Sequence, residues 1–474
     1  MTVAAGLIPG VAAAAPLDSA LGDANLTQPR TLSRSVWLVE FDGKQTGDLL
    51  GRPIDRIGLF AWDGTRMEPI PFQVDERDAN GRWILPEGDE PDRSDDGGRL
   101  GDLDVVVVEA KAVGNRYLGG AYQSFFPSTI TAATELEFRH PKDGTRGWVY
   151  GFAFEGEPIR STADLVTYDP VRSEIIGQTY RLRYDPKIPV SWKELRFKQS
   201  TAADASWSDN LIDRIKIRIE ASLGWGLLDI ERNEEQFNTR IPAYKDGPIR
   251  VIRRQINTVD LVLGIQSPET EFEVQFLPDG INMPIKVMLP FRPDGFFSDL
   301  SVLGGIDFRD MKGWRFFTSN DPTPVTVDGT MSSAERSLSK EDCDWIVFYN
   351  DNRAFIQRVH MGQSLKVTRE VAWEDDATGE DPPEYIQGQL PMFGYRMKGW
   401  ENLDAGTYTL GMASYNIPDY RPGKEKAYLE LLGTPIGVTA NAVTLAPVGA
   451  AIAKEGLPAI SIGGDHPALT AGQP

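Results

Sequence analysis

The densest group of residues that could do chemistry is a run of carboxylates between positions 75 and 104. Its members are Asp75, Glu76, Asp78, Glu87, Asp89, Glu90, Asp92, Asp95, Asp96, Asp102 and Asp104. Closely spaced aspartates in a loop with asparagine and glycine can wrap Ca²⁺, which takes about six to eight oxygen ligands. The spacing does not match an EF-hand loop. The run therefore has two interpretations. One is a calcium site, whose ligands we expect to be Asp92, Asp95, Asp96 and Asp102, and the other is a solvated acidic loop.

Tryptophan offers a second kind of chemistry, the stacking of sugars. Beyond residue 200, tryptophan stands beside glycine at Trp225, Trp314 and Trp400. A tryptophan next to glycine can lie open on a sheet or loop, where the apolar face of a sugar stacks on the ring. The alternative is that these residues anchor a hydrophobic core. We expect Trp225, Trp314 and Trp400 to contact a polysaccharide or oligosaccharide.

Histidine offers little for metal binding or acid–base catalysis. The three histidines are His140, His360 and His466, and none has a Cys or His companion at the spacing of a zinc site. His360 ends the clearest predicted hairpin and is a further candidate ligand contact, with an ordinary strand-end role as the alternative. The Gly-x-Ser-x-Gly elbow of serine hydrolases is absent. Enzymatic activity stays open, since a hydrolase or lyase could use carboxylates, arginine and tyrosine alone.

The overall charge bears on the partners of the chain. The 474 residues include 69 acidic and 49 basic side chains, which gives a net charge of −20. Such a charge repels phosphate backbones and anionic lipid surfaces, so we expect no nucleic-acid partner. The single cysteine, Cys343, cannot form an internal disulfide, and its acidic neighbours disfavour the reactive thiolate.

The elements that must position these residues are predicted to be β-strands. The chain has 46 glycines and 33 prolines, spaced too closely for many long helices. Residues 215–219 alternate isoleucine with a basic residue, which predicts a strand with its charges in water. Residues 345–359 predict a hairpin around an Asn-Asp-Asn turn. We expect an all-β fold with few short helices, in which a small N-terminal β domain precedes a large, supersandwich-like double-sheet β-sandwich.

Four segments are predicted along the chain. Residues 1–24 form a signal-like or flexible segment, 25–140 a β-sandwich-like domain, 141–445 the large β-sandwich and 446–474 a flexible tail. The division at 140 rests on the Pro- and Gly-bearing stretch 141–144.

The N-terminal residues predict export from the cytoplasm. Positions 2–15 form a short apolar run that ends in small residues of the Ala-x-Ala type, as in a secretory signal and its cleavage site. No basic residue precedes Arg30, so an alanine-rich tail is the alternative. No other stretch reaches the ~18 apolar residues needed to span a bilayer. We expect a periplasmic or extracellular protein without a transmembrane segment.

Two segments resemble known proteins. Residues 70–76 (Ile-Pro-Phe-Gln-Val-Asp-Glu) and 101–107 (Gly-Asp-Leu-Asp-Val-Val-Val) resemble a stretch of uncharacterised secreted bacterial β-proteins. Residues 246–254 (Asp-Gly-Pro-Ile-Arg-Val-Ile-Arg-Arg) are similar to a strand entry in sugar-associated β-sandwiches of the galactose-mutarotase type. The second resemblance implies a large sandwich and a sugar ligand. The catalytic histidines of that family have no counterpart here.

Two functions follow from these observations. The first is an exported protein that binds or processes carbohydrate, with calcium in its acidic loop. The second is a structural or accessory subunit that pairs its sheet edges with another exported protein, since unpaired strand edges accept a partner strand.

Overall fold

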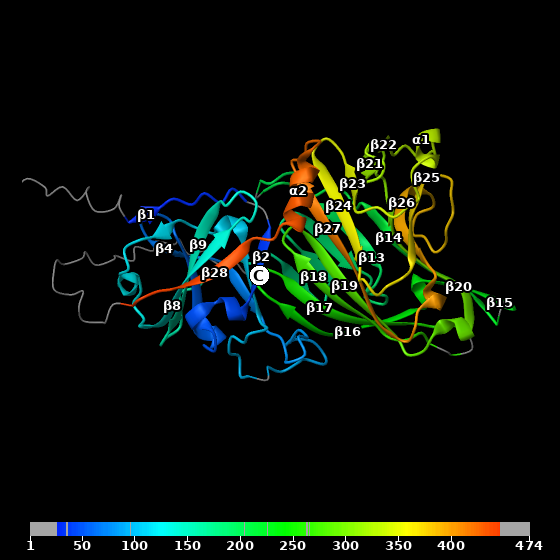
Figure 1. The fold of residues 1–474 in the computed structure, drawn as a ribbon. Helices are drawn as coiled ribbons and strands as arrows, with labels where there is room; N and C mark the ends of the chain where they lie inside the picture. Colours follow the sequence, from blue (N-terminus) through cyan, green and yellow to red (C-terminus); the bar gives the residue numbers. More distant parts are fainter. Residues whose placement is uncertain are drawn as a thin grey trace, which may run out of the picture.

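The chain folds into two β-sandwiches placed end to end. In the computed structural model the residues described are 26–445, except 35–36, 95, 203, 225, 262–263 and 265. Figure 1 shows the smaller sandwich, mainly in blue and cyan, beside a larger one in green and yellow. Strands dominate, and the described residues contain only two α-helices, α1 (Ser333–Arg336) and α2 (Lys424–Gly433). The all-β prediction is therefore confirmed.

The smaller sandwich packs a three-stranded sheet against a five-stranded sheet. The three-stranded sheet has the order β2 (Leu38–Asp42), β6 (Val105–Glu109), β5 (Phe72–Asp75), and the five-stranded sheet has the order β28 (Gly437–Ala442), β8 (Ile130–Arg139), β9 (Arg146–Phe154), β3 (Ile57–Trp62), β4 (Met67–Pro69). Strands β1 (Thr27–Gln28) and β7 (Arg116–Tyr117) form a separate pair. Side chains of successive strand residues point to opposite faces. Val106 and Val108 of β6 therefore meet Leu136 and Phe138 of β8 in one core.

Two strands of the smaller sandwich come from beyond residue 140. β9 pairs with β8 in a hairpin that closes at Arg139 and Arg146. β28 pairs with the other edge of β8, with Val438 opposite Phe138. The sheet thus continues past the division expected at residue 140, because the Pro- and Gly-bearing stretch is a hairpin turn. The segments 1–24 and 446–474, expected to be a signal and a tail, lie outside the described residues.

The larger sandwich is built from three sheets. The long sheet has nine strands, in the order β16 (Phe237–Asp246), β17 (Val251–Val259), β18 (Thr270–Leu277), β19 (Gly280–Leu289), β27 (Gly406–Pro418), β24 (Arg353–Met361), β23 (Ile346–Tyr349), β21 (Arg315–Thr318), β22 (Val325–Thr326). The opposing sheet has five strands, in the order β15 (Leu228–Asn233), β14 (Ile212–Leu223), β20 (Phe297–Phe308), β26 (Gln389–Lys398), β25 (Thr368–Asp376). A four-stranded sheet of β10 (Thr167–Asp169), β11 (Glu174–Ile176), β12 (Tyr180–Tyr184) and β13 (Trp192–Phe197) completes it. The three sheets share one large hydrophobic core.

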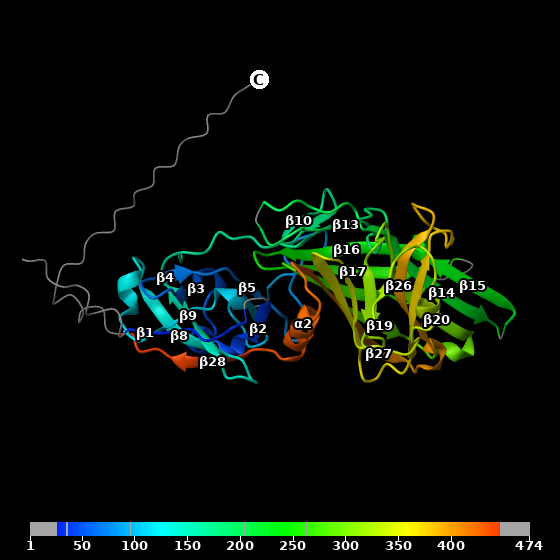
Figure 2. The same cartoon turned by 90° about the horizontal axis from the view of Figure 1, so that it is seen from above.

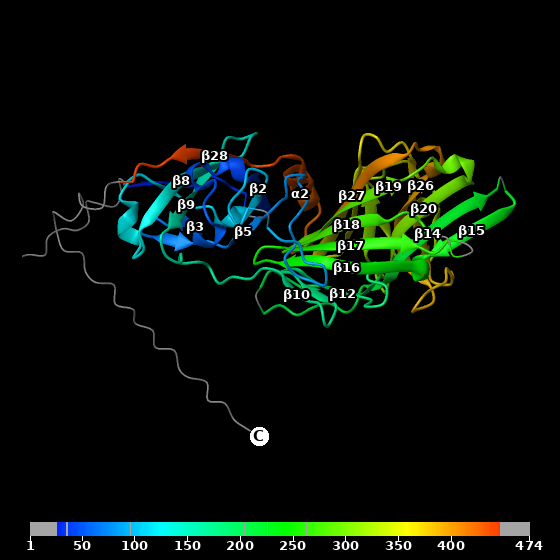
Figure 3. The same ribbon diagram turned by 90° about the horizontal axis from the view of Figure 1, so that it is seen from below.

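The two sandwiches meet along the outer face of β6 and the start of β17. Val105 and Val107 of β6 belong to the same hydrophobic cluster as Ile252 of β17, whose side chain lies on the same side of the strand as Arg250. Helix α2 lies at this junction in all three views (Figures 1, 2 and 3). Beside the apolar contact, Arg250 is buried and donates from Nε to Asp75 Oδ2 at 2.9 Å. The two sandwiches are therefore joined by an apolar contact and a buried ion pair.

Within the described residues, no helix has the length and apolar character needed to cross a membrane.

Candidate functional site

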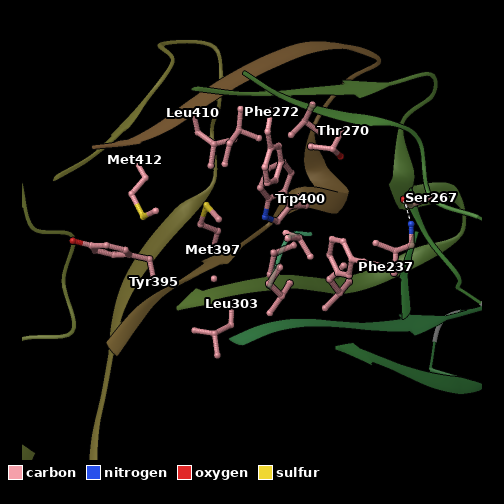
Figure 4. Close-up of a pocket in the computed structure, with 18 of the residues that line it drawn as sticks. Phe237, Ser267, Thr270, Phe272, Leu303, Tyr395, Met397, Trp400, Leu410 and Met412 are labelled. Carbon is pink, nitrogen blue, oxygen red and sulfur yellow. Dashed lines mark hydrogen bonds between the residues drawn. The ribbon is translucent and has the colours of Figure 1, made fainter. Parts of the chain in front are cut away.

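The main candidate site is an apolar cavity between the two long sheets of the larger sandwich. Its volume is about 350 Å³, within the range of roughly 300–1,000 Å³ that small-molecule pockets occupy. Most of its lining side chains are aliphatic, aromatic or methionine side chains. Figure 4 shows Phe272, Met397 and Trp400 grouped at its centre, with Leu410 above Met397 and Leu303 below it. The apolar lining of the cavity suits an apolar small molecule.

One wall of the cavity is the inner face of the five-stranded sheet. Ile217 of β14, Gly304 of β20 and Tyr395 of β26 are neighbours in register and therefore share a face. All three line the cavity. A Cβ added at Gly304 would meet no atom within 4 Å. The absent side chain at this position leaves room in the middle of the wall.

The opposite wall carries a row of polar residues on β17. Arg253, Gln255 and Asn257 alternate along the strand and so point to the same side. Arg253 Nη2 donates to Gln255 Oε1 at 3.0 Å, and Gln255 Nε2 donates to Asn257 Oδ1 at 3.0 Å. Thr239 Oγ1 adds a hydrogen bond to Asn257 Oδ1 at 2.8 Å. Arg253 and Gln255 line the cavity, so a polar stripe runs along one side of an apolar space.

Arg253 is the charged group of this stripe. It is 1% exposed, and within the described part of the chain it forms no ion pair with a carboxylate. Its guanidinium lies over the rings of Tyr184, at 4.4 Å, and Phe276, at 5.1 Å. Cation–π contacts of this kind offset part of the cost of burying a cation. The positive charge is held in place by rings and an amide.

The predicted sugar contacts occupy different places. Trp400, in the 3₁₀-helix η10 (Trp400–Asn402), lines the cavity but is 6% exposed, and Trp314 is equally buried in the large core. Neither forms an open stacking platform, because apolar neighbours cover both rings. His360 lies exposed on β24, and Trp225 is outside the described residues. The sequence analysis missed Arg253 and Gln255. The signal for them is the polar alternation 253, 255, 257, which Arg254 and Thr258 in the same strand partly obscure.

The acidic run is used largely for contacts within the protein. Asp92 Oδ2 pairs with Arg254 Nη1 at 2.8 Å and accepts a hydrogen bond from the Leu85 amide. Asp96 accepts hydrogen bonds from the amides of Gly98 and Arg99, and Asp102 lies exposed. Asp95 lies outside the described residues. Among the residues described, no three His, Cys, Asp or Glu side chains group as metal ligands would. Calcium binding stays a prediction.

The outer face of β14 is buried, although the alternation of isoleucine with basic residues predicted that it would be exposed to water. Lys216 and Arg218 were expected in water, yet both are buried, Lys216 completely, and the preceding Arg214 is buried as well. Glu234, which is also completely buried, pairs with Arg214 Nε at 2.6 Å and Arg218 Nη1 at 2.8 Å. The segment 381–384 covers Lys216, whose Nζ lies 3.3 Å from Glu384 Oε1. The prediction of a solvated face was wrong, because segments distant in the sequence cover it.

Carboxylates with altered acidity surround Lys216. Asp307 Oδ2 lies 3.4 Å from Lys216 Nζ, and burial raises the pKa of Asp307 to about 7. Burial also raises the pKa of Asp213, which accepts a hydrogen bond from the Tyr385 amide. The Tyr385 ring is 52% exposed and lies beside the Arg214 guanidinium. An open aromatic ring next to a carboxylate of raised pKa is therefore a second candidate site.

Comparison with known proteins gives no family for this sequence. No family model matches it, and no curated protein matches it either. Among solved structures, an alpha-mannosidase from Enterococcus faecalis V583 aligns at 10% identity with a TM-score of 0.46, over 88% of this chain and 46% of that chain. A protein in the glycosyl hydrolase family 38 from Enterococcus faecalis aligns at 9% identity with a TM-score of 0.44, over 88% and 47%.

Both structural neighbours are carbohydrate-related proteins, and this chain spans about half the length of each. The galactose-mutarotase resemblance of residues 246–254 stays a prediction.

Proposed function

We propose that the larger sandwich binds a mainly apolar small molecule in the cavity between its two long sheets. The observation that carries this proposal is a space of about 350 Å³ lined by apolar side chains and bordered by one polar stripe. Small-molecule sites have this composition, in which apolar walls supply the binding free energy and a few polar groups fix the orientation. Exposed Phe291 also lines the cavity, so the space reaches the surface near the hairpin between β19 and β20.

The test fills the cavity without disturbing its walls. Wild-type protein should bind the neutral apolar dye Nile red, with a rise in dye fluorescence. Gly304→Leu should weaken this binding by on the order of tenfold or more, because the new side chain occupies the space that the dye needs.

The matched control is Gly433→Leu at the end of α2, outside the cavity, where an added Cβ also meets no atom within 4 Å. This variant should bind the dye like the wild type. Equal dye binding by both leucine variants would overturn the proposal.

A second proposal is carbohydrate binding at the exposed face around Tyr385. It is supported by the open Tyr385 ring and by the hydrogen bond from its hydroxyl to Asp185 at 3.4 Å, which orients the ring. Sugars stack on such rings. Export of the chain, and pairing of its sheet edges with another exported protein, stay predictions alongside this one.

Affinity electrophoresis in gels that contain soluble polysaccharides tests the carbohydrate proposal. Wild-type protein should be retarded by at least one polysaccharide, and Tyr385→Ala should lose most of that retardation because the stacking surface is gone. Phe296→Ala removes an aromatic ring of similar exposure at the far hairpin, and should migrate like the wild type. Absence of retardation with every polysaccharide, or equal retardation of both variants, would contradict the proposal.

A further inference from the structure

The cavity contains a buried cation that the protein itself does not neutralise. Arg250 and Arg254 flank Arg253 closely, and each pairs with a carboxylate, Asp75 and Asp92 respectively. Both lie on the opposite side of the chain from Arg253, because side chains alternate along a strand. A buried charge is ordinarily paired with an opposite charge. Within the described residues Arg253 has no such partner, so the cavity wall holds an uncompensated positive charge.

The guanidinium of Arg253 also has hydrogen-bond donors to spare. Nη2 donates to Gln255, whereas Nε and Nη1 form no hydrogen bond of regular geometry within the described part of the chain. Burial raises the pKa of the nearby Tyr168 hydroxyl, and the charge of Arg253 together with a side-chain contact from it opposes that rise. Buried donors without acceptors are uncommon and call for an explanation such as an absent ligand. The incompletely satisfied donors of a planar guanidinium suit a carboxylate, which has two acceptor oxygens.

The position of Arg253 within the cavity fits a long ligand with one polar end. Arg253 is opposite Val274 of β18, and this row continues to Met283 of β19. Strand β19 ends at Leu289, which also lines the cavity. Leu289 is six positions after Met283, which is roughly 20 Å along an extended strand. An extended alkyl chain can therefore run from Arg253 toward the surface.

The surface end of the cavity is apolar as well. Phe291 and Phe296 pack edge to face with their centroids 5.5 Å apart, and both are about half exposed. Pro290 and Phe297, next to these two rings in the chain, also line the cavity. An apolar rim of this kind lets the tail of a ligand enter without crossing a charged barrier.

We infer that the cavity takes an amphipathic monoanion, an alkyl chain ending in a carboxylate, whose chain lies along the apolar walls and whose carboxylate binds Arg253 beside Gln255. This inference rests on the proposed cavity function and specifies its ligand. Arg253 supplies the charge and a forked pair of donors, and the surrounding apolar walls exclude water and so strengthen the ion pair. The negative charge of the whole protein does not oppose binding at this depth, because the local cation dominates there.

Calorimetry with three matched ligands tests the inference. Dodecanoate, 1-dodecanol and dodecylammonium share one alkyl chain and differ in the charge of the head. At pH 8 and below micelle-forming concentrations, the wild type should bind dodecanoate on the order of tenfold more tightly than dodecanol. It should bind dodecylammonium most weakly, because the cation meets the charge of Arg253.

The variant Arg253→Met removes the charge and keeps an apolar side chain of similar length. It should bind dodecanol at least as well as the wild type and lose the preference for dodecanoate. The ligand order on wild-type protein needs no variant, so the test stands even if Arg253→Met fails to fold.

The outcomes separate the inference from the proposed function. If the wild type binds the three ligands equally, or prefers the ammonium, the inference is overturned while cavity binding stands. A preference for dodecanoate that persists in folded Arg253→Met also overturns it. If the wild type binds none of the three and Gly304→Leu leaves Nile red binding unchanged, the cavity function itself fails.

Discussion

Replacing Glu234 by alanine should lower the free energy of unfolding by about 3–5 kcal/mol, because it leaves two buried arginines without their counter-ion. Glu234 is completely buried under β14, where it contacts Arg214 Nε at 2.6 Å and Arg218 Nη1 at 2.8 Å. It also accepts a hydrogen bond from the Ile217 amide at 3.0 Å. Urea unfolding followed by tryptophan fluorescence measures the loss.

The adjacent residue provides the control for this measurement. Glu235 contacts Arg214 Nη2 at 3.6 Å, but its side chain is 51% exposed. Exposed ion pairs contribute at most about 1 kcal/mol, so Glu235→Ala should change stability little. If the two alanine variants lose the same stability, the buried ion pairs of Glu234 do not stabilise the sheet.

The same network shows where sequence reasoning succeeds and where it fails. The alternation of residues 215–219 correctly places the isoleucines on one face, because strand periodicity is a local property. It does not show what covers the other face. Lys216 is covered by the segment 381–384, more than 160 residues later in the chain. Without knowledge of that distant segment, basic residues on one face of a strand predict that this face is exposed to water.

The return of β28 to the smaller sandwich was hidden for a similar reason. Its pairing with β8 joins residues about 300 positions apart, and the sequence Gly-Val-Thr-Ala-Asn-Ala carries no signal for its partner. The carboxylates of the acidic run were visible as a group, but their arginine partners on or beside β17 were not. Arg253 escaped notice because a charged residue in a strand ordinarily predicts an exposed position.

Replacing Arg250 by methionine should also cost about 3–5 kcal/mol of unfolding free energy, and should loosen the junction between the two sandwiches. Arg250 is completely buried and donates to Asp75 at 2.9 Å and to Glu40 at 2.8 Å. Burial alone would raise the pKa of Asp75, but Arg250 and Lys245 hold it below the usual value of 3.8. Ionised Asp75 therefore stabilises the fold above about pH 4, and this contribution is lost as the pH falls through the lowered pKa.

Two further variants separate the buried ion pair from general effects of substitution. Arg240→Met breaks a pair of similar length with Glu90, at 2.8 Å, but both of those side chains are about half exposed. It should cost less than about 1 kcal/mol. The double variant Arg250→Met/Asp75→Leu removes both fully buried charges, and the partners it leaves, Lys245 and Glu40, are 18% and 47% exposed and can be solvated. It should therefore recover part of the stability that Arg250→Met alone loses. If the double variant is instead less stable than Arg250→Met, the cost lies in lost packing and not in an uncompensated carboxylate. If stability does not change in Arg250→Met, the two sandwiches are held together by the apolar contact of β6 with β17 alone.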